Sequence, residues 1–134
     1  MDTLEFIIPG KPKYNTVVKV AIGAIANTCG FDIETIDDIK TATLEACKTI
    51  CCHGYIGLAE KYRLTCTVDK GYVQIEVRDD VGGEIKEKGV RPCQKCPQEG
   101  DLSIHIMQGL MDKVEISSGE NGKRYIKIEK RLNE

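Results

Sequence analysis

Two stretches of this 134-residue chain carry residue types that could do acid–base chemistry or contact a ligand. A run with helical spacing, Ile39–Tyr55, contains Glu45 and, one helical turn later, Thr49. A carboxylate such as Glu45 can take a proton from an attacking hydroxyl group that lies within hydrogen-bonding reach. The second stretch, 77–83, pairs two aspartates with two glycines at the end of a strand-like segment. Together the two stretches are typical of two corners of a nucleotide site.

Cysteines supply a second set of residues with chemical potential. Cys93 and Cys96 form a Cys-x-x-Cys pair in a loop-like stretch, while Cys52 and His53 end the helical run. These four side chains could form a tetrahedral site for zinc or for another soft metal. Alternatively, Cys93 and Cys96 could form a reversible disulfide. A third interpretation is that the helix cysteines pack as small apolar residues and the loop dithiol is simply exposed.

Periodicity predicts the elements that must position these residues. A strand is expected at Leu4–Ile8, and helices at Pro12 to about Cys29, Asp32 to about Cys52 and Leu102–Met111. Hairpins are expected from 62–68 with 72–77, and from 114–117 with 124–128, while 83–100 is expected to be a loop. This order predicts an α/β two-layer sandwich, with a mixed or antiparallel sheet and helices on one face.

Composition limits the class of protein. The length fits one domain, residues 1–134, and 41% hydrophobic with 30% charged residues is ordinary for a soluble globular chain. A net charge of −2 argues against a general nucleic-acid binder. The apolar run 17–26 is too short to cross a membrane, and acidic residues near Met1 argue against a secretory signal. We therefore expect a cytoplasmic protein in which the seven cysteines are free thiols or metal ligands.

The order of elements and motifs resembles the bacterial anti-sigma-factor serine-protein kinases of the GHKL ATPase superfamily, with its histidine-kinase-like ATPase fold. The resemblance covers nearly the whole chain. It is carried by these segments: Asp38–Thr41, Glu45–Ala46, His53–Tyr55, Arg78–Asp80, Ile106–Met107 and Leu110–Ile116. It implies binding of a sigma factor, phosphorylation of a serine on an antagonist (anti-anti-sigma) protein with ATP and Mg²⁺, and a homodimer.

The resemblance also implies a role for individual residues. Glu45 would be the general base, and Thr49 occupies the position of the family amide that holds Mg²⁺. Asp79 would accept a hydrogen bond from adenine. Lys19 stands where the family carries a basic residue that contacts protein partners. The cofactor-binding glycine boxes would correspond to Gly83, Gly100 and Ser103.

Several positions depart from the family pattern. Thr49 replaces an Asn, Val81 replaces a Gly, and Asp101 with Ser103 replaces the glycines whose N–H groups would wrap phosphates at a helix start. Each change predicts weaker nucleotide binding or weaker Mg²⁺ chemistry. We therefore expect a regulator that binds a sigma factor or an antagonist, with kinase activity weakened or lost. The alternatives are a metal- or redox-sensing module that uses Cys93 and Cys96, and a redox-partner adaptor that binds neither ATP nor a sigma factor.

Overall fold

The computed structural model describes residues 1–51, 61–78, 99–118 and 124–132. The helical elements are the short 3-10 helix η1 (Pro12–Tyr14), α1 (Asn15–Thr28), α2 (Ile33–Cys51) and α3 (Glu99–Leu110). The strands are β1 (Asp2–Pro9), β2 (Lys61–Asp69), β3 (Tyr72–Arg78), β4 (Lys113–Ser118) and β5 (Arg124–Arg131). The expected order of strands and helices is therefore confirmed.

The five strands form one sheet in the order β1-β2-β3-β5-β4, and every neighbouring pair is antiparallel. Of the two expected sheet types, the antiparallel one is confirmed. The last hairpin enters the sheet through β5, which pairs with β3 from Tyr72↔Arg131 to Arg78↔Tyr125. The strands β1 and β4 consequently form the two edges of the sheet.

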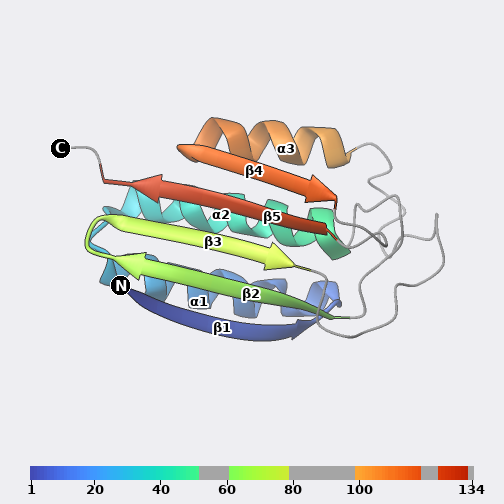
Figure 1. The fold of residues 1–134 in the computed structure, drawn as a ribbon, viewed down its shortest axis with the longest axis horizontal. Helices are drawn as coiled ribbons and strands as arrows, with labels where there is room; N and C mark the ends of the chain where they lie inside the picture. Colours follow the sequence, from blue (N-terminus) through green and yellow to red (C-terminus); the bar gives the residue numbers. More distant parts are fainter. Residues whose placement is uncertain (52–60, 79–98, 119–123, 133–134) are drawn as a thin grey trace.

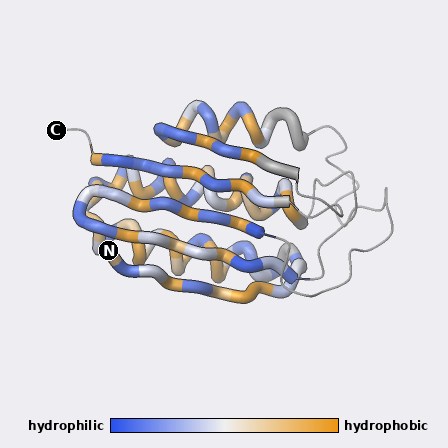
Figure 2. The backbone as a smooth tube through the Cα atoms, in the orientation of Figure 1, coloured by the Kyte–Doolittle hydropathy of each residue, from blue (hydrophilic) through white to orange (hydrophobic). Residues whose placement is uncertain are grey.

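All three α-helices cover the same face of the sheet, which gives a two-layer sandwich (Figure 1). Hydrophobic and hydrophilic residues alternate along the strands, as a sheet with one covered face requires (Figure 2). The core lies between the layers, where Ile22, Ile39, Ile75, Met107 and Ile128 are fully buried. Burial of such side chains supplies the main driving force for folding.

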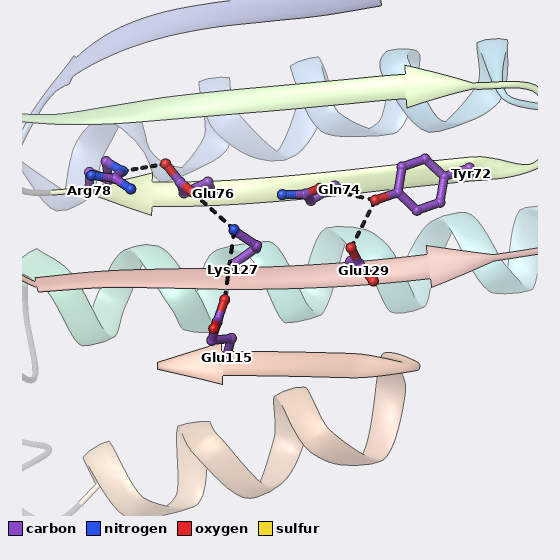
Figure 3. Close-up of polar contacts among 7 residues, drawn as sticks. All are labelled: Tyr72, Gln74, Glu76, Arg78, Glu115, Lys127 and Glu129. Atoms are coloured by element: carbon purple, nitrogen blue, oxygen red, sulfur yellow. Dashed lines mark hydrogen bonds and ion pairs between the residues drawn. The ribbon is translucent and has the colours of Figure 1, made fainter. Parts of the chain in front are cut away.

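The opposite face of the sheet is polar (Figure 3). Lys127 on β5 lies 3.8 Å from a Glu76 carboxylate oxygen on β3 and 3.7 Å from a Glu115 oxygen on β4. The Tyr72 hydroxyl donates a hydrogen bond to Glu129 at 2.8 Å. Because these charges pair across neighbouring strands, this face does not form a second core.

Two helix ends follow from local chemistry. The Asp32 carboxylate accepts a hydrogen bond from the Thr35 backbone N–H at 2.8 Å, as an N-cap does, so the predicted start of α2 is confirmed. Gly30, with a φ of 91°, follows the last turn of α1. Its N–H donates to the Asn27 carbonyl, which confirms the predicted stop.

Two predicted boundaries were wrong by about one turn. Residues from Pro12 form a 3-10 turn, and the α-helix begins only at Asn15, because Tyr14 has a ψ of −1°. The helix expected from Leu102 begins at Glu99, so Asp101 lies inside its first turn rather than at its cap. Acidic residues are favoured throughout the first turn of a helix, so their presence does not locate the cap itself.

The end of α2, the start of α3 and the end of β3 all lie at the same end of the sheet (Figure 1). This end therefore brings together the segments that carry Glu45, Thr49 and Ser103. Within the described part of the chain, no helix has the length and apolar character needed to span a membrane.

Candidate functional site

Glu45 lies on the last third of α2, and its carboxylate is held at the contact between α2 and α3. Its Oε2 atom accepts a hydrogen bond of 2.5 Å from the Ser103 hydroxyl on α3. Its Oε1 atom lies 3.7 Å from the Lys48 ammonium group, one turn further along α2. The Glu45 side chain is 15% exposed, so solvent still reaches part of it. A partly buried carboxylate with fixed partners is suited to accept a proton from a positioned donor.

Local sequence explains why Glu45 sits at this contact. Ala42, Ala46 and Cys47 surround it on α2 and are fully buried, while Glu45 lies at the margin of the buried face. Small side chains let a neighbouring helix approach closely, and α2 packs against α3 here. The carboxylate therefore meets a partner on α3 instead of extending into solvent.

Thr49, the position expected near Mg²⁺, donates its hydroxyl hydrogen to the Glu45 backbone carbonyl at 2.9 Å. Donation to the carbonyl four residues earlier is a common arrangement for threonine within a helix. A hydroxyl group still has acceptor capacity after it donates its hydrogen. The orientation of the Thr49 hydroxyl, however, is set by its hydrogen bond to the backbone of α2.

Ser103 was predicted, together with Gly100, to line the phosphates of a nucleotide. The structure places Ser103 in the third position after Gly100 on α3, only 1% exposed, with its hydroxyl directed at Glu45. Its side chain thus contacts the predicted base, which the sequence reasoning missed. The spacing held a signal: Ser103, Met107 and Met111 recur every four residues, and all three are buried.

Six other predicted site residues fall outside the described residues. These are Asp79 and Gly83 of the nucleotide site, and Cys52, His53, Cys93 and Cys96 of the metal or redox site. Among the residues that the structure does describe, no group of three or more His, Cys, Asp or Glu side chains could hold a metal ion. The metal and redox interpretations stay predictions.

Three cysteines within the described ranges, Cys29, Cys47 and Cys66, are buried free thiols. Burial raises the pKa of the Cys66 thiol to about 12, and the neighbouring Cys29 adds to the effect. Burial also raises the pKa of Cys29. The thiols of Cys29 and Cys66 therefore stay protonated at neutral pH, and all three cysteines pack as small apolar groups.

Lys19, predicted to contact a protein partner, is exposed on α1. Two apolar neighbours on the same helix, Val17 and Val20, are 56% and 67% exposed. Lys19 and both valines are thus exposed on α1, and the role of Lys19 stays untested.

Comparison with known proteins identifies the relatives of this chain. Residues 8–128 match the family model described as "Histidine kinase-like ATPase domain". The chain is 29% identical over 129 residues to the serine-protein kinase RsbW of Bacillus pumilus, with 88% of this chain and 80% of that protein covered. It is 30% identical over 125 residues to the RsbW of Halalkalibacterium halodurans, with 86% and 75% covered.

A solved structure shares the fold. It contains the RsbU and RsbW domains of Rv1364c from Mycobacterium tuberculosis and superposes with a TM-score of 0.70 at 16% identity. The match covers 98% of this chain and 32% of that chain, so this chain spans about a third of the larger protein. This likeness confirms the two-layer fold expected from the sequence.

Proposed function

We infer the function from one premise: the chain belongs to the histidine kinase-like ATPase family, whose model covers residues 8–128. We propose that it is an anti-sigma-factor-like regulatory protein that binds a sigma factor or an antagonist protein. Its serine-protein kinase fold has phosphotransfer activity that is weakened or lost. The RsbW serine-protein kinases among its relatives support the kinase fold. The motif resemblance supports the class of partner.

The observation that carries the catalytic part of this proposal is the position of the Glu45 carboxylate. It lies between α2 and α3, at the end of the sheet where β3 ends. There it would accept the proton of an attacking serine hydroxyl. ATP would be held by Asp79, Gly83 and Gly100, and it would supply the phosphoryl group.

Two hydroxyl groups support weaker binding of Mg²⁺ and of the phosphates. Thr49, at the position expected to hold Mg²⁺, directs its hydrogen to the Glu45 carbonyl. Ser103, at a position expected to contact phosphate, directs its hydrogen to the Glu45 carboxylate. Mg²⁺ requires near-ideal octahedral geometry, and a short hydroxyl side chain held by its own helix adapts poorly to that requirement.

Partner binding is proposed for the exposed surface of α1 around Lys19. Exposed apolar side chains grouped with a charge are typical of surfaces that bind another protein. Val17 and Val20, 56% and 67% exposed, supply the apolar part of this surface.

The test of the catalytic part is phosphotransfer from labelled Mg-ATP to candidate antagonist proteins. Glu45→Ala should lower the rate at least about 100-fold, the smallest usual effect of removing a general base. Glu34→Ala is the matched control, because Glu34 is an exposed acid in the first turn of the same helix. A Glu45→Ala protein that phosphorylates as fast as the parent would remove the base assignment. A parent protein without product would mean that the activity is lost, and would leave partner binding as the function.

A further inference from the structure

The structure describes two fully buried polar side chains, Thr43 and Ser103, among the residues whose burial is resolved. Thr43 donates its hydroxyl hydrogen to the Ile39 carbonyl, four residues earlier on its own helix, at 2.8 Å. Ser103 also lies inside a helix, where a serine hydroxyl can bond to the carbonyl four residues earlier. It bonds instead to Glu45, 58 residues away in the sequence. Both buried hydroxyls therefore have a hydrogen-bond acceptor, but Thr43 finds it on its own helix and Ser103 finds it on another helix.

The bond from Ser103 has consequences for the carboxylate that accepts it. A hydrogen bond to a charged acceptor is about twice as strong as a bond between neutral groups, and it fixes the acceptor's orientation. At 1% exposure, the Ser103 side chain is shielded from bulk water. It holds Oε2 of Glu45 against α3, while Oε1 lies 3.7 Å from the Lys48 ammonium group, so the orientation of the carboxylate is fixed from both sides.

We infer that Ser103 is a positioning residue for Glu45: its hydroxyl holds Oε2 and thereby fixes the orientation of the carboxylate that accepts the proton of the substrate serine. This inference rests on the proposed function. In the reaction, the substrate serine oxygen forms a bond to the γ-phosphorus of ATP, the bond between that phosphorus and the β,γ-bridging oxygen breaks, ADP leaves, and the serine proton passes to the Glu45 carboxylate. Ser103 acts only through Glu45 and touches neither reactant.

The test is steady-state phosphotransfer by the full chain with Ser103→Ala. A side chain that orients the base contributes to the chemical step and not to binding of ATP. We expect kcat to fall about tenfold or more, as for loss of a hydrogen bond to a charged group, with KM for ATP changed less than about twofold. Ser103→Thr, which keeps the hydroxyl, should retain more of kcat than Ser103→Ala.

Thr43→Val is the matched control, because it also removes a buried hydroxyl that does not touch Glu45. It should leave kcat unchanged even where it lowers stability. An unchanged kcat in Ser103→Ala would overturn the inference. So would equal losses of kcat in Ser103→Ala and Thr43→Val, since these would report a general effect of lost buried hydroxyls.

A second measurement separates this inference from the proposed function. If the parent protein has no phosphotransfer activity, urea unfolding of Ser103→Ala, Glu45→Gln and the double variant forms a thermodynamic cycle. Coupling that changes the unfolding equilibrium constant about tenfold would support Ser103 as the residue that fixes Glu45. Additive effects would overturn the positioning role, whatever the fate of the kinase proposal.

Discussion

At the scale of the residue, two positions that depart from the family pattern are connected through Glu45. Thr49 bonds to its backbone carbonyl, and Ser103 bonds to its carboxylate. From the sequence, Thr49 was predicted to lie near Mg²⁺ and Ser103 near the phosphates of the nucleotide. The structure shows that both hydroxyl hydrogens are committed to protein acceptors. Each of these hydroxyl groups thus has an acceptor at residue 45, as partly buried polar groups require.

Restoring an amide at position 49 should strengthen the Mg²⁺-dependent part of ATP binding. The amide oxygen of Thr49→Asn reaches further than a hydroxyl and is not held by the helix backbone. We expect the affinity for Mg-ATP to rise roughly tenfold, about 1.4 kcal/mol, with little change for ATP in EDTA. Calorimetry of both titrations measures the difference.

Thr41→Asn is the control for this experiment, because Thr41 is exposed on the same helix. If Thr49→Asn leaves the affinity for Mg-ATP unchanged, the weakness lies in the altered glycine positions and not at Thr49.

Because of the buried Cys66 thiol, we expect the free energy of unfolding to depend on pH in the alkaline range. The pKa of this thiol is raised from 9.0 to about 12 by burial, so the folded state keeps its proton where the unfolded state has lost it. Stability contributed by this thiol is present below pH 9 and is lost as pH rises from about 9 towards 12, by up to about 1.4 kcal/mol per pH unit.

Urea unfolding between pH 8 and pH 11 tests this expectation. The parent should lose stability more steeply than Cys66→Ala, although the variant starts from a lower value because a buried side chain is truncated. Parallel slopes in the two proteins would contradict the assignment of this pH dependence to Cys66.

At the scale of the element, the sequence predicted what short-range chemistry determines. Asp32 and Gly30 located the boundary between α1 and α2, since a side-chain cap and a positive φ act within a few residues. The start of α3 was misplaced because an acidic first turn is compatible with several cap positions. The contact between Ser103 and Glu45 could not be located from spacing alone, because it depends on how two helices pack.

The turn between β2 and β3 supplies a prediction at this scale. Gly71 has a φ of 68°, and a Cβ atom there would lie 3.2 Å from the Leu132 Cβ atom. Its N–H donates to the Cys29 carbonyl and its carbonyl accepts from the Leu132 N–H, each at 2.8 Å. Gly71→Ala should therefore lower the free energy of unfolding by about 1 to 2 kcal/mol or more, because a side chain is strained in this conformation.

Gly109→Ala on α3 is the matched control for the turn variant. A Cβ atom at Gly109 meets nothing within 4 Å, so alanine should stabilise the helix by up to about 1 kcal/mol. Thermal unfolding should move in opposite directions for the two variants. A Gly71→Ala protein as stable as the parent would contradict the strain argument.

At the scale of the whole molecule, the order of elements and the two-layer fold could be predicted, but the strand order could not. Apolar periodicity identifies which residues face a core, while the insertion of β5 between β3 and β4 depends on pairing between segments distant in sequence. The same limit applies to the site. The structure brings Glu45 on α2 into contact with Ser103 on α3, and this contact depends on the packing of the whole sandwich.

The central claim, that the chain acts by binding a sigma factor or an antagonist through α1, is tested most directly by one binding measurement. The labelled chain is titrated by fluorescence anisotropy with the sigma factors and antagonist proteins of its source, alongside the Lys19→Glu and Lys113→Glu variants. Lys113 is exposed on β4, the sheet edge opposite β1, and serves as the charge-matched control. We expect saturable binding to at least one candidate, weakened about tenfold or more by Lys19→Glu and unchanged by Lys113→Glu. Absence of binding to every candidate, or equal binding by both variants, would contradict the account.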